Sequence, residues 1–328
     1  MLLQLLVPQY NETNSEVKPL LDSLLVQQNI DFNEIGVIIV NDGSDTLLDE
    51  DWLSSSYPFE IKYFKAPHQG VSATRNEALS HATAEYVMFC DADDMFYNAC
   101  GLWILFREMK GEPFNALMSF FTEETRNPET KEIVYINHEQ DFTFVHGKVY
   151  RRQYLLDENI KFNPALTIHE DSYFNYLAQH ISDSNKVKLC MTPFYLWRWR
   201  DNSVCRHDPK YILKTYNNML DSSTALIKEL LKRKRKDLAE EVSTAMIMDA
   251  YFTMNKDEWI NQENREYRIK TERRFKEYYL EFKSLFDSID KQKKTQIIMG
   301  LKNRMYMEGL VMESITFDDW IKEVMEEY

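Results

Sequence analysis

The chain has 328 residues, of which 44% are hydrophobic and 13% aromatic, so it can bury a substantial core and fill roughly two domains. Its formal net charge of −14 argues against a broad surface for DNA or an anionic membrane, although a local basic groove is compatible with it. The four cysteines show neither close pairing nor metal-ligand spacing, which indicates free thiols in a reducing compartment. Apolar runs too short to span a bilayer and a start without a signal segment predict a cytoplasmic protein, with a peripheral position at a membrane left open.

Short apolar runs alternate with amphipathic segments through the first third of the chain. Leu2 to Val7 predicts a buried strand, and the helix after it is predicted to begin at a capping box formed by Thr13 and Glu16. Three further strands are expected over Gly36–Asn41, Glu60–Lys65 and Tyr86–Cys90, and a helix is expected over Val71–Ala84. This alternation predicts an α/β fold with a mostly parallel sheet, whose loops converge on one edge.

The composition changes in the last third of the chain. All nine prolines lie at or before Pro209, and glycine is absent between Gly147 and Gly300. Beyond this point, apolar residues recur at helical spacing through several charged segments. We therefore predict an α/β domain over residues 1–209 and a helical C-terminal domain over residues 210–328.

The most informative motif is the segment Asp91-Ala92-Asp93-Asp94, which directly follows the apolar run of the strand predicted at Tyr86 to Cys90. Two aspartates separated by one residue can hold a divalent cation through hard oxygen ligands, and the cation can then hold a diphosphate. Such acids at the carboxyl end of a buried strand are typical of a charged ligand site. The competing interpretation is an acidic helix start, because aspartate also favours N-caps.

Polar segments also follow the other predicted strands. They are Val7-Pro8-Gln9-Tyr10-Asn11, Val40-Asn41-Asp42-Gly43-Ser44-Asp45 and His68-Gln69-Gly70-Val71-Ser72-Ala73-Thr74-Arg75-Asn76. Together with the Asp-x-Asp motif, these segments resemble in order and spacing the family 2 glycosyltransferases of GT-A fold. The resemblance implies a catalytic domain over 1–209, with a nucleotide-binding half (1–100) and an acceptor half (101–209).

The resemblance also implies roles for single residues. The donor nucleotide is expected to contact Pro8, Tyr10, Asn11, Asp42, Arg75, Asp91, Ala92 and Asp93. Tyr10 would stack beside the base and Asp42 would accept a hydrogen bond from it, with a turn of the Asx type as the structural alternative for Asp42. Arg75 would neutralise phosphate or brace the Asp-x-Asp carboxylates, with a purely structural salt bridge as its alternative.

Within the Asp-x-Asp motif, the family pattern implies a division of labour. Asp93 is expected to be the direct ligand of Mn²⁺ or Mg²⁺, with Asp91 nearer the ribose. Asp94 is expected to cap the next segment.

The acceptor half resembles bacterial polysaccharide and teichoic-acid-type sugar transferases of the same family. The similarity rests on His146 to Arg152 and on the pair Glu170-Asp171, which in those enzymes ends in the catalytic base. An inverting transfer needs one carboxylate that removes the proton of the acceptor hydroxyl. Asp171 is assigned this role and Glu170 a supporting one, whereas without the upstream motifs the pair would indicate only a helix N-terminus.

The segment from Tyr195 to Ser203 resembles the closing loop of the family, where an arginine and a serine five residues later grip the diphosphate. This implies donor contacts from Arg198, Arg200 and Ser203, in a loop that excludes water from the donor. His207 is a candidate for a further metal ligand, with a solvated surface histidine as the alternative.

The resemblance implies a metal-dependent, inverting hexosyltransferase. It would move a sugar from a nucleoside diphosphate donor, with UDP favoured, to a hydroxyl of a saccharide or polymer acceptor. Two alternatives stay open: an inactive scaffold that binds sugar nucleotides, and a transferase that acts on nucleic acid or protein. Homo-oligomers formed through the C-terminal helices are also left open.

Overall fold

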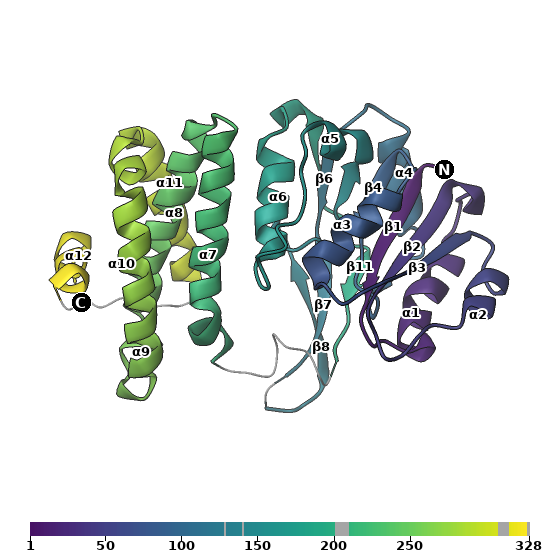
Figure 1. The fold of residues 1–328 in the computed structure, drawn as a ribbon, viewed down its shortest axis with the longest axis horizontal. Helices are drawn as coiled ribbons and strands as arrows, with labels where there is room; N and C mark the ends of the chain where they lie inside the picture. Colours follow the sequence, from purple (N-terminus) through teal and green to yellow (C-terminus); the bar gives the residue numbers. More distant parts are fainter. Residues whose placement is uncertain (128, 140, 201–209, 308–314, 327–328) are drawn as a thin grey trace. The chain divides into compact units, whose positions relative to one another are not determined.

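The computed structural model describes residues 1–127, 129–139, 141–200, 210–307 and 315–326. Contacts within the chain divide it into two units, Met1–Ser203 (unit 1) and Val204–Tyr328 (unit 2). Unit 1 combines strands and helices, and unit 2 is helical (Figure 1). The predicted domain boundary at residue 209 stays a prediction, because residues 201–209 lie outside the described ranges.

Unit 1 is built on a seven-stranded sheet with the order β10-β6-β9-β4-β1-β2-β3. Its strands are β1 (Leu3–Gln9), β2 (Ile35–Asp42), β3 (Glu60–Ala66), β4 (Tyr86–Phe89), β6 (Ala116–Ser119), β9 (Val149–Arg151) and β10 (Val187–Cys190). β1 pairs in parallel with β2 on one side and with β4 on the other. The chain thus continues from β1 to β2 and β3 on one side, and it returns to β4 on the other side. Open α/β sheets bind ligands at the carboxyl ends of the strands where the strand order reverses in this way.

A second sheet of four strands has the order β5-β11-β7-β8. Its strands are β5 (Met95–Phe96), β7 (Phe121–Arg126), β8 (Ile133–His138) and β11 (Tyr195–Trp197). β11 pairs with β5, which directly follows the Asp-x-Asp segment. This pairing brings the residues after β11 to the carboxyl end of β4.

Helices flank the large sheet of unit 1 (Figure 1). They are α1 (Asn14–Leu25), α2 (Glu50–Ser55), α3 (Val71–His81), α4 (Gly101–Met109), α5 (Arg152–Asp157) and α6 (Glu170–His180), with 3₁₀ turns at Phe32–Glu34 and Ser184–Lys186. The capping box at the start of α1 is confirmed, since the Glu16 carboxylate accepts a hydrogen bond from Thr13 N–H at 2.8 Å.

Helix α3 ends three residues before the predicted limit at Ala84. The side-chain oxygen of Gln4 accepts hydrogen bonds from the backbone N–H groups of Thr83 and Ala84, at 2.6 and 2.8 Å. These two N–H groups therefore bind Gln4 of β1 and do not continue the helix. The chain leaves the helix at Ala82, which has an extended backbone.

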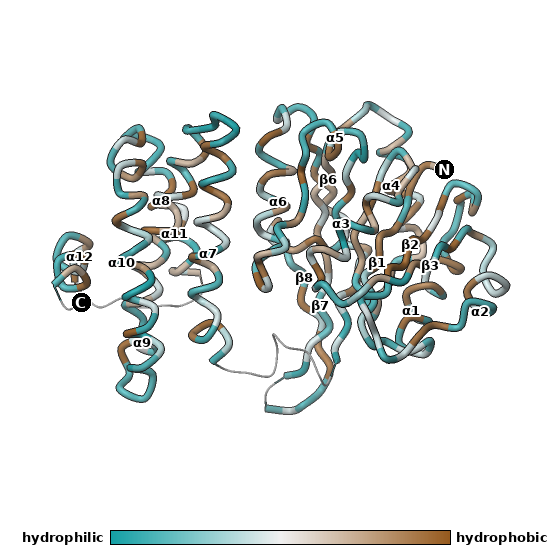
Figure 2. Tube along the Cα trace, in the orientation of Figure 1, coloured by the Kyte–Doolittle hydropathy of each residue, from teal (hydrophilic) through white to brown (hydrophobic). Residues whose placement is uncertain are grey.

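The core of unit 1 lies on the central strands. All eight residues of β2 are buried, and Figure 2 shows β1 and β2 with hydrophobic residues along most of their length. Burial of each large aliphatic side chain contributes about 1.5–3 kcal/mol, so these strands form a rigid base for the loops that leave their carboxyl ends.

Unit 2 contains α7 (Tyr211–Lys232), α8 (Lys236–Met254), α9 (Asp257–Ile260), α10 (Arg265–Ser288), α11 (Lys291–Met307) and α12 (Phe317–Glu326), with a 3₁₀ turn at Gln262–Asn264. Helices α7, α8 and α10 pack on one another around buried side chains such as Tyr216, Ile247 and Tyr278. Across the described part of both units, we find no helix that combines the length and the apolar content needed to cross a bilayer.

Candidate functional site

Four polar segments meet at the carboxyl ends of β1, β2, β3 and β4, as the sequence predicts. The first two are joined by side chains. Asn11, which has a left-handed backbone (φ 66°), donates its N–H to Ser44 Oγ at 2.8 Å, and its Oδ1 accepts the N–H of Asp45 at 2.9 Å. The loop after β1 is thus held against the loop after β2.

Asp42 joins the second segment to the third. Its side chain is only 5% exposed, and its two oxygens accept hydrogen bonds from the N–H groups of Gln69 at 2.7 Å and Gly70 at 3.0 Å. The carboxylate therefore anchors the loop before α3, and the predicted hydrogen bond from Asp42 to a nucleotide base stays a prediction.

An exposed pair of rings lies beside this anchor. The rings of Tyr10 and His68 stack with centroids 4.6 Å apart and planes 28° apart, and both side chains are about half exposed. His68 Nδ1 also lies 3.0 Å from the backbone oxygen of Asp42. The ring of Tyr10, which is predicted to stack beside the nucleotide base, is therefore already paired with His68. Pro8, another predicted donor contact, is partly exposed.

The Asp-x-Asp segment forms a turn between β4 and β5. Asp91 lies between two basic side chains, with Oδ1 2.9 Å from Arg75 Nη2 and Oδ2 3.4 Å from His146 Nε2. Burial alone would raise the pKa of Asp91, but the charge of Arg75 and the hydrogen bond from His146 outweigh it and lower this pKa. The side chain of Ala92 is buried in the core, so its predicted donor contact stays a prediction.

Asp94 does not cap the next segment, in contrast to the expectation from sequence. It is fully buried, and its carboxylate accepts hydrogen bonds from Tyr195 Oη at 2.8 Å and from Arg198 N–H at 3.0 Å. Tyr195 Oη in turn accepts the N–H of Asp91 at 3.0 Å. Burial, together with the charges of Asp93 and Asp91, raises the pKa of Asp94. This carboxyl group therefore fastens the turn to the end of β11.

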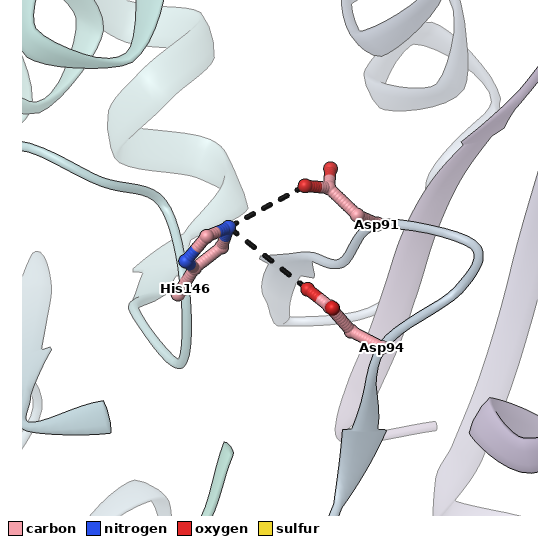
Figure 3. A group of neighbouring side chains, drawn as sticks. All are labelled: Asp91, Asp94 and His146. Carbon is pink, nitrogen blue, oxygen red and sulfur yellow. Dashed lines mark hydrogen bonds and ion pairs between the residues drawn. The ribbon is translucent and has the colours of Figure 1, made fainter. Parts of the chain in front are cut away.

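His146 completes a group that can hold a metal ion. Figure 3 shows its Nε2 directed toward both Asp91 and Asp94, and the potential ligand atoms of the three side chains all lie within 4.8 Å of one another. Two carboxylates and an imidazole are suitable ligands for a divalent cation such as Mn²⁺. The imidazole stacks against Phe144 and Tyr195, and its Nδ1 is buried without a hydrogen-bond partner in the described part of the chain.

Arg75 connects the turn to the predicted catalytic pair. The side chain is 4% exposed, and its guanidinium lies 2.9 Å from Asp91, 3.0 Å from Glu170 and 2.5 Å from Asp171. Burial would lower the pKa of Arg75, but the three carboxylates outweigh it and raise this pKa, so the guanidinium stays charged. The two interpretations proposed for Arg75 thus coincide: it braces Asp91 and it forms a buried ion-pair network.

Glu170 and Asp171 are the first two residues of α6. Asp171 is held from two sides, by Arg75 and by the N–H of Val145, which lies 3.2 Å from Oδ2. Burial and the charge of Asp171 raise the pKa of Glu170 to about 7. A fixed carboxylate next to a carboxyl group that titrates near neutrality is an arrangement suited to proton removal from a hydroxyl.

Two arginines follow β11 and reach Asp93. Arg198 Nη1 donates to the backbone oxygen of Asp93 at 3.0 Å. Arg200 Nη1 lies 2.8 Å from Asp93 Oδ2 and 3.3 Å from Glu12 Oε1. The predicted contributors Ser203 and His207 lie outside the described residues.

Comparisons with known proteins identify the family. The family model described as "Glycosyl transferase family 2" matches residues 5–162, which span all four donor-side segments. Residues 5–162, which make up most of unit 1, belong to this family. The recognition of family 2 from the strand-end motifs is therefore confirmed.

Two curated proteins are similar to the chain over much of its length. "Uncharacterized glycosyltransferase EpsJ" of Bacillus subtilis is 25% identical over 224 residues, which cover 62% of this chain and 62% of that protein. "Minor teichoic acid biosynthesis protein GgaB" of the same organism is 26% identical over 224 residues, covering 63% of this chain and 24% of that protein. The chain therefore spans less than two thirds of the length of either relative.

A solved structure of similar fold is that of residues 1–349 of TarS from Staphylococcus aureus. It is 17% identical, with a TM-score of 0.61, and the match covers 94% of this chain and 92% of that one. At this identity the likeness concerns the fold, and it confirms the predicted α/β GT-A fold class with a C-terminal helical region.

Three participants in the family 2 site of unit 1 were not predicted from the sequence. Glu12 belongs to none of the motif segments, Tyr195 stands only at the start of the predicted closing loop, and His146 received no role. Their functions depend on contacts with residues at least 55 positions away, such as the His146–Asp91 pair and the Arg200–Glu12 pair. The only local signal was the presence of His146 in a segment that resembles the acceptor half.

Proposed function

We propose that the protein transfers a sugar from a nucleoside diphosphate donor, with UDP favoured, to a hydroxyl group of a saccharide or polymer acceptor. The observation that carries the proposal is the network around Arg75, which joins the Asp-x-Asp turn to the pair Glu170-Asp171. Membership of glycosyl transferase family 2 supports the activity. The choice of UDP is supported by TarS, whose similar fold has been solved in complex with UDP and with UDP-GlcNAc.

The proposed reaction is a single displacement that inverts the configuration of the sugar. Asp171 takes the proton of the acceptor hydroxyl while its oxygen forms a bond to the anomeric carbon, and the bond from that carbon to the diphosphate breaks. Arg75 and Val145 N–H fix the orientation of this base. Glu170 supports the base from the adjacent position, and Arg198 and Arg200 supply positive charge near the departing diphosphate.

The residues of the Asp-x-Asp turn fit Mn²⁺ or Mg²⁺, which would neutralise charge on the departing diphosphate when bound. We assign Asp93 as the ligand that faces the donor, because its side chain is 16% exposed and its carboxylate contacts the partly exposed side chain of Arg200. Asp94, by contrast, is enclosed and already accepts hydrogen bonds from Tyr195 and Arg198. His207, the further candidate ligand, lies outside the described residues.

Mn²⁺ titration separates these assignments. Asp93→Ala should weaken Mn²⁺-dependent donor binding strongly, because the direct ligand is lost. His146→Ala should weaken it less, because His146 acts on Asp91 and Asp94 from inside the core. The opposite order would move the metal to the enclosed group formed by Asp91, Asp94 and His146.

The first test of the function is a thermal-shift screen of nucleoside diphosphates and their sugars with Mn²⁺, Mg²⁺ or a chelator. A ligand that binds only the folded state stabilises it by about 2.7 kcal/mol at one hundred times its Kd. We expect UDP and a UDP-sugar to raise the Tm in a metal-dependent manner. If no nucleotide changed the Tm under any metal condition, the proposal would be wrong.

Asp171→Asn tests the base. The variant should bind the donor like the wild type but transfer the sugar about 10²–10⁴-fold more slowly, since general base catalysis contributes about that factor. The matched control is Asp157→Asn, because Asp157 is an exposed acid whose carboxylate accepts a hydrogen bond from Gln153. Unchanged turnover of Asp171→Asn would remove the base assignment, and donor binding without transfer in the wild type would favour the scaffold alternative.

A cytoplasmic location, a peripheral position at a membrane and homo-oligomers formed through unit 2 all stay predictions.

A further inference from the structure

Both carboxylates of the Asp91-x-Asp93 motif face an arginine, but the two arginines differ in their surroundings. Arg75 is 4% exposed and is shared among three carboxylates within unit 1. Arg200 is 36% exposed and contacts Asp93 and Glu12 from the segment after β11. The guanidinium of Arg75 is therefore enclosed among its carboxylates, whereas the side chain of Arg200 can be reached by water and by a ligand.

The position of Arg200 conflicts with a cation on Asp93. Its Nη1 lies 2.8 Å from Asp93 Oδ2, so a guanidinium already neutralises the carboxylate that we assign to the metal. A divalent cation on the same oxygen would repel the guanidinium strongly at this distance. Binding of the metal therefore requires the Arg200–Asp93 ion pair to break.

We propose that Arg200 takes the place of the divalent cation on Asp93 while the donor is absent, and pairs with the donor diphosphate when the cation binds. This inference rests on the proposed function, because it needs a metal-dependent diphosphate donor. A guanidinium is well suited to the exchange, since it forms two parallel hydrogen bonds with carboxylates and with phosphates alike.

The contacts of Arg198 keep the segment in place during this exchange. Arg198 donates its N–H to Asp94 and its Nη1 to the backbone oxygen of Asp93, and neither contact uses the Asp93 carboxylate. Glu12 provides a second partner for Arg200, and Glu12 Oε2 accepts the N–H of Tyr10 at 2.7 Å. Arg200 thus connects the loop that carries Tyr10 to the metal-binding turn.

The exchange couples the two ligands thermodynamically. Metal alone binds weakly, because it must break the Arg200–Asp93 pair. A diphosphate that arrives with the metal offers Arg200 a new partner and strengthens metal binding. Each ligand then raises the affinity for the other by the same factor.

The test measures Mn²⁺ affinity from the electron paramagnetic resonance signal of the free ion, first without nucleotide and then with UDP. We compare the wild type with Arg200→Gln, Arg200→Lys and the control Arg126→Gln. Arg126 lies over the ring of Trp199, 5.6 Å from its centroid, so the control removes the same charge from the neighbouring strand β7. Thermal denaturation of each variant reports whether it folds.

Without nucleotide, Arg200→Gln should bind Mn²⁺ about fivefold more tightly than the wild type, as expected for the loss of a partly exposed ion pair. Arg126→Gln should stay within about twofold, and Arg200→Lys should stay near the wild type because its charge is kept. With UDP present, the gain in Mn²⁺ affinity should be smaller in Arg200→Gln than in the wild type.

Two results would overturn the proposal in distinguishable ways. If the wild type binds Mn²⁺ and UDP but Arg200→Gln shows no tighter Mn²⁺ binding than Arg126→Gln, the exchange is wrong and the proposed function stands. If the wild type binds neither Mn²⁺ nor UDP, both the exchange and the metal-dependent donor site are wrong.

Discussion

Arg75→Met is expected to destabilise unit 1 in a pH-dependent way. Methionine keeps much of the length and apolar contact of the arginine stem, but it loses the guanidinium, which also lies over the Phe162 ring, 5.2 Å from its centroid. What it removes is the cation between Asp91, Glu170 and Asp171. Three carboxylates would then face one another without a neutralising charge.

The magnitude follows from the burial of this network. Removal of one partner from a buried ion pair costs about 3–5 kcal/mol, because the remaining charge is left uncompensated. Glu170 and Asp171 are 13% and 14% exposed, but Asp91 is 31% exposed and is partly screened by solvent. At pH 8 we therefore expect a loss of about 3–5 kcal/mol in the free energy of unfolding.

The loss should shrink at low pH. Without Arg75, mutual repulsion raises the pKa values of the three carboxyl groups above their unfolded values of about 4. The folded variant then binds protons more tightly than the unfolded chain, so its stability falls as the pH rises above about 4. The difference from the wild type should accordingly be smaller at pH 5 than at pH 8.

Urea denaturation at pH 5 and pH 8 measures both quantities. Arg107→Met is the matched control, because Arg107 is exposed on α4 and lies over the ring of Trp103 at 5.2 Å. The control should change stability by no more than about 0.5 kcal/mol. A loss below about 1 kcal/mol for Arg75→Met at pH 8, or an equal loss at both pH values, would refute the reasoning from buried charge.

Two further substitutions test neighbouring features. Glu170→Gln should remove a pH dependence of stability. Glu170 has a pKa of about 7 in the folded protein, against an ordinary value of 4.5. The wild type therefore loses stability as the pH rises through this interval, by at most about 3 kcal/mol. Denaturation curves between pH 4.5 and 8 should therefore be flatter for the variant, and parallel curves would contradict the shift. Gly147→Ala should lower stability by about 1–3 kcal/mol, because Gly147 has a φ of 73° and an added Cβ would lie 2.7 Å from Ser119 Oγ. Ser119→Ala removes both the close oxygen and its 2.6 Å hydrogen bond to Gly147 O, so Gly147→Ala should lower the Tm less in a Ser119→Ala background than in the wild type. A Gly147→Ala variant as stable as the wild type would count against this packing.

The parts of the fold that the sequence predicts are those determined by local patterns. Continuous apolar runs identify β1 and β2, and the pair Thr13 and Glu16 marks the start of α1. The end of α3 could not be predicted, because Gln4 competes for its last N–H groups from a distance of 79 and 80 residues along the chain.

The candidate site shows the same division. Asp91 and the pair Glu170-Asp171 stand in recognisable motifs, so they could be selected as site residues from the sequence, and the structure joins them through Arg75. Asp94 was misinterpreted because an aspartate before a new segment usually caps it, whereas here the pairing of β5 with β11 brings Tyr195 Oη to its carboxylate. Such a contact depends on the register of two distant strands, and a single sequence contains no record of it.

The side chains of Asn11 and Asp42 have a consequence for the redesign of donor preference. Asn11 fastens the first donor loop to the second, and Asp42 fastens the second to the third, each through bonds to backbone N–H groups. The three loops that we propose to bind the nucleotide are therefore joined in the protein without any ligand, and little ordering cost would remain for binding. A substitution in one loop will be transmitted to the other two, so variant libraries that aim at a different nucleotide should diversify the three loops jointly and leave Asn11 and Asp42 unchanged.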